Sequence, residues 1–325
     1  MTLRMRAAFA VLTLAIPALS SAAASAQAAE ARPAWAFPLN PPNFQLTPDD
    51  GRNLHVPGST ITYKLPQVRD AFFAPDWRPD DHPALPEVVA TGRKPDVRAC
   101  GYCHRATGPG GPENASLTGL PSAYFMQQMS EFKSGARAGS PPQLPPLRGM
   151  IAAAKGAMDS EVAAAAAYFS SLAPQQLYRV VETDVAPKTY IYNSVYLTLA
   201  SGETERLGPG IVEVPEDSNR FEARDPSVGF VVYAPEGSVA KGETLVTTGG
   251  GKAAACATCH GPNLKGLGPV PPIAGRSPSF MFRQLYDFQH GARTGMWSPL
   301  MAGIVTNLTE DDMISIVAYL ATRAP

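Results

Sequence analysis

All four cysteines of this 325-residue chain lie in two short patterns of the same form. The patterns are CGYCH at residues 100–104 and CATCH at residues 256–260. Two thiols at this spacing can form thioethers with the two vinyl groups of a haem, and the histidine that follows can then ligate the iron. We therefore expect two covalently attached haem c groups. The expected thioether cysteines are Cys100, Cys103, Cys256 and Cys259, and the expected iron ligands beside them are His104 and His260.

Two other chemistries also use paired cysteines. In an oxidising compartment each pair could form a structural or redox disulfide, but a disulfide needs neither the histidine nor a second copy of the pattern. Two pairs could also supply the four sulfurs of a zinc site. The separation of 156 residues between the copies favours two separate units instead. Haem attachment is the interpretation that uses every defining residue of both patterns.

An internal repeat surrounds the two patterns. A shift of 156 residues aligns residues 100–137 with residues 256–293 without a gap, and ten of the 38 positions are identical. Before the shared Gly-Ala-Arg, both copies place apolar residues at i, i+4 and i+7, which predicts a helix. After it the first copy has five extra residues, and both copies then end in an amphipathic pattern with acidic residues in its first turn. That pattern predicts terminal helices at 159–172 and 309–321.

The repeat also indicates the second axial ligand of each iron. No histidine other than those of the two patterns occupies a position shared by both copies, since His290 aligns with Ser134. Methionine is shared, because Met150 and Met301 precede the terminal helices by the same distance. A thioether is a soft ligand that raises the iron potential. We therefore expect Met150 and Met301 as ligands. Both could instead be core residues, in which case the nearest competitors are Met158 and Met296.

These features resemble the class I c-type cytochromes, and particularly the diheme cytochromes of the c4 and c553 kind. The second copy carries the closest match, in CATCHG at 256–261, PPIAG at 271–275, FQHGAR at 288–293, Met301 and LTEDD at 308–312. The resemblance covers roughly residues 85–173 and 238–325. It leaves residues 30–84 and 174–237 without a counterpart.

The first copy departs from that family at two positions. Arg105 replaces the glycine after the histidine, and Ala115 stands where the family usually has proline. The resemblance implies that the carbonyls of Ala115 and Pro271 accept the Nδ1 hydrogen of the two haem-ligating histidines. Arg137 and Arg293 could pair with haem propionates through forked hydrogen bonds. Alternatively, they are solvated surface arginines.

The predicted fold class is mainly α, with two class I cytochrome c domains in tandem. A small β-rich insert separates them, and a Pro-rich irregular arm precedes them. Arg4 and Arg6 before an apolar run, followed by small residues, predict a cleaved signal peptide and export to the periplasm. No comparably long apolar segment follows, so we expect no membrane span in the mature chain. The expected parts are signal peptide 1–28, arm 29–84, cytochrome c domain 85–173, insert 174–237 and cytochrome c domain 238–325.

The arm and the insert have different compositions. The arm is rich in proline and tryptophan, and we expect it to pack through its aromatics over the first haem domain. Short β-branched runs between Gly and Pro predict a small antiparallel sheet in the insert. The insert holds ten acids against five bases. This surplus indicates either a solvated face or a docking surface for a basic redox partner.

The expected function is transfer of single electrons in the periplasm, without catalysis. A formal net charge of −1 and the lack of long basic runs argue against nucleic-acid binding. Expected partners are redox proteins: a dehydrogenase or a membrane quinol-oxidising complex as donor, and a cytochrome or terminal oxidase as acceptor. One alternative is a diheme peroxidase-type enzyme, in which His55 or His82 would supply a ligand or base. The other is the electron-accepting subunit of a dehydrogenase complex.

Overall fold

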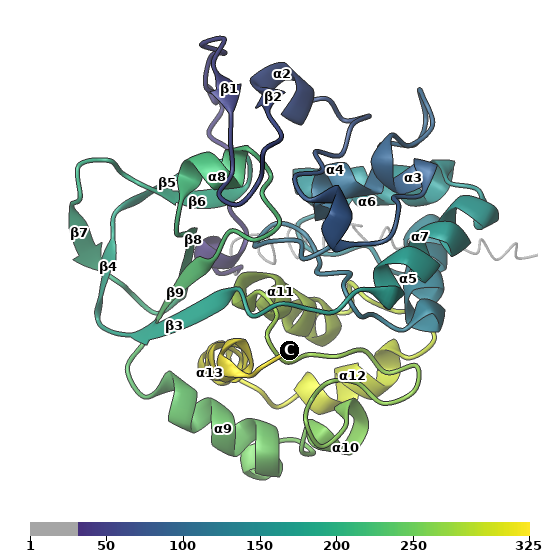
Figure 1. Cartoon of the computed structure of the whole chain (residues 1–325). Coiled ribbons are helices and arrows are strands. Elements are labelled where there is room, and N and C mark those ends of the chain that lie inside the picture. The colour runs from purple at the N-terminus through teal and green to yellow at the C-terminus, as the bar shows by residue number, and fades with distance from the viewer. Residues whose placement is uncertain (1–31) are drawn as a thin grey trace, which may run out of the picture. The chain divides into compact units, whose positions relative to one another are not determined.

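Matching sets of helices occupy the two copies of the repeat (Figure 1). The computed structural model describes residues 32–325, so the expected signal peptide lies outside the described residues. The first copy contains α3 (Glu87–Ala90), α4 (Cys100–His104), α5 (Ser122–Ser134), α6 (Pro145–Gly156) and α7 (Asp159–Ser171). The second contains α9 (Ser238–Thr248), η3 (Gly249–Gly251), α10 (Ala257–His260), α11 (Pro278–Gln289), α12 (Ser298–Val305) and α13 (Glu310–Thr322). The expected helices before the shared Gly-Ala-Arg and at the ends of both copies are confirmed. Among residues 32–325, no helix has the length and apolar content that crossing a bilayer requires.

The two terminal helices begin with the same local signal. At α13, the Thr309 side chain accepts from the amide of Asp312 at 3.1 Å, and the Asp312 carboxylate accepts from the amide of Thr309 at 2.9 Å. At the matching place in α7, the Glu161 carboxylate accepts from the amide of Met158 at 2.7 Å. Such bonds satisfy backbone donors that have no partner within the helix. Local sequence therefore sets where both helices start.

The strands between the two copies all fall within residues 174–237. They are β3 (Tyr178–Glu182), β4 (Val185–Pro187), β5 (Thr189–Tyr192), β6 (Val195–Thr198), β7 (Thr204–Arg206), β8 (Val212–Pro215) and β9 (Phe230–Ala234), with helix α8 (Ser218–Glu222) before β9. The pairs β4–β7, β5–β6 and β8–β9 are antiparallel, as expected. The expectation is wrong for β3 and β9, which pair in parallel. The long segment that connects these two strands lets the chain return to the same end of the sheet, as parallel pairing requires.

The arm is irregular, as expected, but it does not pack over the first copy alone. Its short elements are η1 (Ala34–Ala36), β1 (Asn53–Leu54), β2 (Tyr63–Lys64), α2 (Leu65–Val68) and η2 (Pro79–Asp81). The ring centroid of Trp35 lies 4.5 Å from that of Phe282, and the centroid of Phe37 lies 5.3 Å from that of Tyr286. Both partners belong to α11 of the second copy. The start of the arm therefore adds its aromatics to the apolar face of α11, and later residues of the arm, such as Ala74, bond to the first copy.

Three hydrophobic cores lie within residues 32–325, and the smallest joins arm residues around Trp77 to Ala223 of the insert. Another consists of first-copy residues only, including Val89, Phe125 and Phe169. The third joins the helices of the second copy to buried residues of the insert and the arm, such as Phe230 and Phe37. The insert is therefore continuous in its packing with the second copy.

Candidate functional site

One cavity of about 710 Å³ reaches both cysteine patterns. It is lined by the expected site residues Cys100, Cys103, His104, Arg137, Met150, Cys256, Cys259, His260, Arg293 and Met301. The competing methionines do not line it: Met158 is 50% exposed and Met296 is 77% exposed. Met129 and Met281 also line the cavity, but they occupy different positions of the repeat. Met150 and Met301 are thus methionines of the cavity wall that the repeat makes equivalent.

Each pattern histidine is oriented by a backbone carbonyl. Nδ1 of His104 lies 2.8 Å from the oxygen of Ala115, and Nδ1 of His260 lies 2.8 Å from the oxygen of Pro271. A carbonyl oxygen only accepts, so Nδ1 carries the hydrogen and Nε2 carries the lone pair that can ligate a metal. Burial lowers the pKa of His104 to about 4 and lowers that of His260 as well. Both imidazoles are therefore neutral at pH 7, as ligation requires.

The first cysteine of each pattern is a free thiol in surroundings that oppose its ionisation. Burial raises the pKa of Cys100 to about 12 and that of Cys256 to about 11. A thiol held in its protonated form is a poor nucleophile for disulfide exchange. Among residues 32–325, no three His, Cys, Asp or Glu side chains gather into a group that could hold a metal ion. The arrangement suits neither a redox disulfide nor a four-sulfur zinc site.

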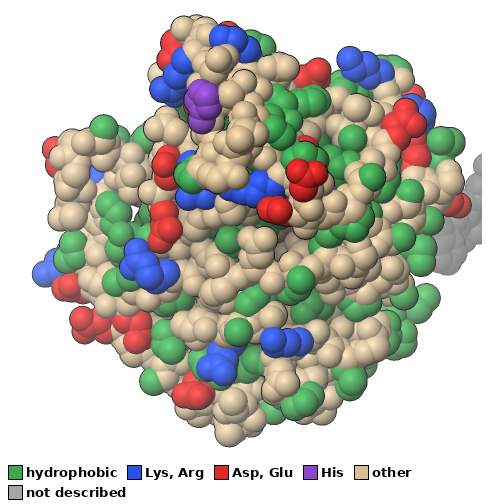
Figure 2. Space-filling model, in the orientation of Figure 1, with side chains coloured by type: hydrophobic (Ala, Val, Ile, Leu, Met, Phe, Trp, Pro, Cys, Tyr) green, Lys and Arg blue, Asp and Glu red, His purple; other side chains and the backbone are tan. Residues whose placement is uncertain are grey.

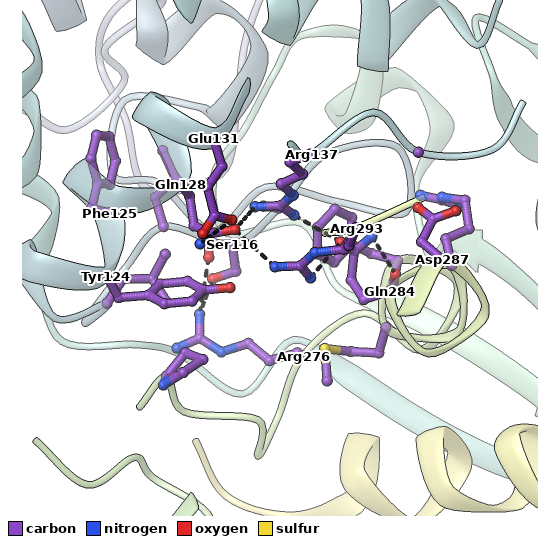
Figure 3. A pocket seen from close by; sticks show the side chains of 18 of the residues that line it. Ser116, Tyr124, Phe125, Gln128, Glu131, Arg137, Arg276, Gln284, Asp287 and Arg293 are labelled. Carbon is purple, nitrogen blue, oxygen red and sulfur yellow. Dashed lines mark hydrogen bonds between the residues drawn. The ribbon is translucent and has the colours of Figure 1, made fainter. Parts of the chain in front are cut away.

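Arg137 and Arg293 face each other across the contact between the two copies (Figure 3). Arg137 donates to Oε1 of Gln128 at 2.8 Å and to Oε1 of Gln284 at 2.7 Å. Arg293 donates to the same two oxygens, at 2.8 and 3.2 Å respectively. Both arginines are buried, so the alternative of solvated surface arginines is wrong.

The backbone hydrogen bonds beside these arginines also run reciprocally between the two copies. The amide of Ala138 donates to the carbonyl of Ala292 at 2.9 Å, and that of Thr294 donates to the carbonyl of Ala136 at 2.7 Å. In addition, one carboxylate of each copy accepts a hydrogen bond from a backbone amide of the other copy. Asp287 accepts from the amide of Ser140 at 2.9 Å, and Glu131 accepts from that of Met296 at 3.2 Å. A shift of 156 residues converts each bond into its counterpart, so the contact has approximate two-fold symmetry.

Four buried arginines line the cavity without a carboxylate partner in the described residues. They are Arg137, Arg276, Arg283 and Arg293. Arg276 donates to the side chain of Ser116 and, at 3.0 Å, to the carbonyl of Thr118. Burial lowers the pKa of Arg276 to about 10, and burial together with Arg293 lowers that of Arg137 to about 9. Buried cations need anions, so the cavity is suited to a negatively charged occupant.

The comparisons with known proteins agree with this geometry. A family model described as Cytochrome c matches residues 239–324. Cytochrome c-554(547) of Halothiobacillus neapolitanus is 33% identical over 94 residues, which make up 26% of this chain and 97% of that protein. The chain belongs to the cytochrome c family. It is a diheme class I cytochrome c with covalently bound haem c.

Longer alignments cover about two thirds of this cytochrome. Cytochrome c4 of Azotobacter vinelandii is 27% identical over 236 residues, covering 68% of this chain and 82% of that protein. The thiosulfate dehydrogenase electron acceptor of Thiomonas intermedia (strain K12) is 25% identical over 232 residues, covering 70% and 80%. The structure of thiosulfate dehydrogenase (TsdBA) from Marichromatium purpuratum is similar with a TM-score of 0.50 and 26% identity. That match covers 73% of this cytochrome and spans 39% of the larger chain.

The residues of this cytochrome fit haem c on chemical grounds. In each copy, two thiols, a neutral oriented imidazole and a thioether line the cavity. Each haem has two propionates, and the four buried arginines offer cations that could pair with them. Arg276 and Arg283 were missed by the sequence analysis, because no local pattern distinguishes a buried arginine from a surface one.

Arg105 replaces glycine without changing the backbone. Its φ is +69°, close to the +82° of Gly261 at the equivalent position, and this region is unfavourable for a residue with a Cβ. The side chain is buried, lies 3.7 Å from Oε1 of Glu113 and is 5.1 Å from the ring centre of Phe221 in the insert. Contacts with the insert therefore offset the backbone strain.

The two histidines considered for the enzyme alternative do not line the cavity. His55 is exposed. His82 is held by Asp76, 3.1 Å from its Nε2, and by the hydroxyl of Tyr168, 3.1 Å from its Nδ1. Neither is placed to act on a haem-bound substrate.

Part of the acidic surplus of the insert is buried. Glu213 is 1% exposed and accepts from the hydroxyl of Ser277 at 3.0 Å and the amide of Ser279 at 2.9 Å. Asp225 is fully buried and pairs with Arg78 and Arg220. On the face in Figure 2, acidic side chains over the insert are interspersed with basic ones. These observations argue against the acidic docking surface.

Proposed function

We propose that this cytochrome carries single electrons between redox proteins in the periplasm. When bound, each haem supplies an iron that accepts and releases one electron. The chain holds both ligands of each iron in one position through the redox change. The observation that carries the proposal is that a full set of attachment and ligation residues from each copy lines a single cavity.

We assign the roles of these residues as follows. Cys100 and Cys103 hold the first haem and Cys256 and Cys259 the second, through thioether bonds. His104 with Met150, and His260 with Met301, ligate the two irons. Carbonyl bonds to Nδ1 keep each imidazole in the tautomer that ligates through Nε2. Arg137 and Arg293 pair with propionates.

The proposed organisation follows the expected parts. Residues 85–173 and 238–325 are cytochrome c domains in tandem, residues 174–237 are the insert and residues 29–84 are the arm. Residues 1–28 direct export and are removed. The separate core of the first copy and the approximate two-fold contact support this arrangement.

Carbon monoxide separates an electron carrier from an enzyme. Two irons that each have a methionine ligand in place leave no position for the gas, so we expect the spectrum of the reduced holoprotein to be unchanged when carbon monoxide is added. Absorption spectroscopy of the purified protein makes the measurement. Binding of the gas at one iron would favour the peroxidase-type alternative.

We propose a dehydrogenase as the electron donor, and thiosulfate dehydrogenase is the first candidate. The support is the similarity to a thiosulfate dehydrogenase electron acceptor and to the TsdBA structure. Thiosulfate with a purified thiosulfate dehydrogenase should reduce the holoprotein, as followed by its absorption spectrum, while thiosulfate alone should not. If reduction occurs only with other dehydrogenases or with quinol, the carrier proposal stands with a different donor.

A further inference from the structure

The insert contributes a cation to the haem-attachment helix of the first copy. The guanidinium of Arg224 lies 3.8 Å from the ring centre of Tyr102 and donates to the Tyr102 carbonyl at 2.7 Å. Its Nε donates to the carbonyl of Val68 in the arm, also at 2.7 Å. The Tyr102 carbonyl belongs to the peptide that continues into Cys103, one of the attachment cysteines. Arg224 therefore places a positive charge beside the first haem-attachment pattern.

The backbone at Arg224 is strained for an arginine. Helix α8 ends at Glu222 with Ala223 as its C-cap, so Arg224 occupies the next position, where helices commonly have a left-handed glycine. Its φ is +57°, which is unfavourable for a residue with a Cβ. The contacts that its guanidinium makes in the arm and the first copy offset this strain. Glycine would suit the backbone better but would leave those contacts unmade.

The charge of Arg224 has no carboxylate partner among residues 32–325. The two nearest acids in the sequence, Glu222 and Asp225, pair with other arginines. Arg105, the buried cation next to the first haem-ligating histidine, lies 3.7 Å from Glu113, so that pair adds little net charge. Arg224 does not line the cavity either, which separates it from the arginines available to the propionates. Its charge therefore acts on the first site without a neighbouring anion.

The second attachment helix has no equivalent cation. Thr258 takes the place of Tyr102 and is exposed. In the part of the chain that the structure describes, no side chain donates a hydrogen bond to the carbonyl of Thr258 or of Cys259, the carbonyls that match those of Tyr102 and Cys103. The arm also packs on the first attachment helix, where a Cβ on Gly101 would lie 2.7 Å from Cβ of Ala74. The arm and the insert thus make the two sites different.

A fixed cation favours the reduced form of a nearby haem iron. Ferric haem has one more positive charge than ferrous haem, so a guanidinium repels the ferric form more strongly. Solvent weakens the repulsion, because Arg224 is half-buried rather than fully enclosed. The effect is therefore moderate and falls mainly on the first site.

We propose that Arg224 raises the reduction potential of the first iron, so that the insert sets the potentials of the two irons relative to each other. This inference rests on the proposed function, since it requires haem at both sites. When the protein carries one electron, the first iron is reduced as the second is oxidised, and no bond or proton changes place. Arg224 shifts this exchange toward a ferrous first iron.

The test replaces Arg224 and measures the potential of the first iron. Spectroelectrochemical titration of the holoprotein in a Met301→His background separates the two irons, because that change lowers the potential of the second alone. Arg224→Gln removes the charge and keeps a hydrogen-bond donor. At an applied potential near the midpoint of the first iron, we expect its ratio of ferrous to ferric form to fall about fivefold. Arg224→Lys keeps the charge and should keep most of the ratio.

The matched control is Arg179→Gln, which removes an exposed arginine of the same insert and should leave the ratio unchanged. Arg224→Gly is a second neutral variant that suits the left-handed backbone, so it decides the question if R224Q does not fold. An unchanged ratio in the neutral variants would overturn the inference. Equal losses in R224K and R224Q would also overturn it, because they would show that the contact matters and the charge does not.

The second iron provides a further check. Titrated in a Met150→His background, it should respond to R224Q much less than the first iron does, and equal shifts at both irons would contradict a local effect of Arg224. The same titration separates this inference from the proposed function. If the wild-type holoprotein does not take up one electron at each of two irons, the proposed function itself fails. If it does, and R224Q has no effect, only the role of Arg224 is wrong.

Discussion

The first and second copies hold the same site residues in different surroundings. The first copy packs a core of its own, and the arm and insert cover its attachment helix. The second copy shares its core with the insert and the start of the arm, and its attachment helix is open. The repeated residues thus define a common haem chemistry, while the residues outside the repeat distinguish one site from the other.

Removing one attachment pair should have the largest effect, and it tests how independent the copies are. Cys100→Ala with Cys103→Ala should leave a protein with one haem, because the second copy keeps its own core and ligands. Intact mass of the exported protein measures this. The matched variant Cys256→Ala with Cys259→Ala should accumulate less, since the second copy shares its core with the insert and arm. Complete loss of haem from the first variant would show that the copies mature as one unit.

Exchanging the axial methionine should lower the potential of one iron at a time. Met301→His should keep its iron six-coordinate but lower its potential by on the order of 0.1 V, because imidazole stabilises ferric iron better than a thioether does. Spectroelectrochemical titration measures both irons separately. Met150→His should do the same at the other iron. Met296→Ala is the control; if it removes the methionine ligation spectrum, the equivalence of Met150 and Met301 is wrong.

Replacing Arg137 or Arg293 should lower the stability of the holoprotein by nearly equal amounts if the contact between the copies is symmetric. Arg137→Gln and Arg293→Gln each remove a buried cation that faces the same two glutamine oxygens, so each should destabilise the holoprotein by about 3 kcal/mol. Denaturant unfolding followed by haem absorption makes the measurement. Clearly unequal losses would mean that the propionates depend on one arginine more than on the other.

Replacing the carboxylates that cap the terminal helices should have the smallest effects on stability, and these effects should depend on pH. Burial opposes ionisation of Asp312, but bonds from Lys241, Lys252 and Thr309 outweigh it and hold its pKa well below the usual range. The hydrogen bond from Arg93 lowers the pKa of Glu161, which occupies the equivalent position. A depressed pKa in the folded state stabilises the protein above the ordinary carboxyl pKa, and this contribution is lost as the pH falls through the folded value.

We expect Asp312→Asn to cost about 2 kcal/mol, because it leaves Lys241 and Lys252 without the carboxylate. Glu161→Gln should cost about 1 kcal/mol, because the carboxylate of Glu161 is less buried than that of Asp312. Thermal unfolding at neutral and acid pH measures both. The difference between each variant and the wild type should shrink toward acid pH. A constant difference would mean that the charge of the capping carboxylate contributes nothing.

The features that were predicted correctly are those that depend on residues close together in the chain. The haem-attachment patterns, the helices on either side of them and the placement of Met150 and Met301 on the cavity wall follow from short-range periodicity and from the repeat. The burial of Arg137 against Arg293 does not, because it depends on how two distant segments meet. The same holds for Trp35 on α11, for the burial of Glu213 and for the parallel pairing of β3 with β9. Each is a long-range contact between segments whose local patterns suit several neighbours.

Arg283 sets an order of events during biosynthesis. Its guanidinium donates to the carbonyl of Ala36 at 2.9 Å and to that of Pro112, so one side chain of α11 ties the arm and the first copy to the second. A chain is made and delivered from its N-terminus, so residues 36 and 112 emerge well before residue 283. Until α11 arrives, the carbonyls of Ala36 and Pro112 lack the guanidinium that joins them in the folded chain. The contact that ties the arm and the first copy to the second therefore forms late, after most of the chain has been delivered.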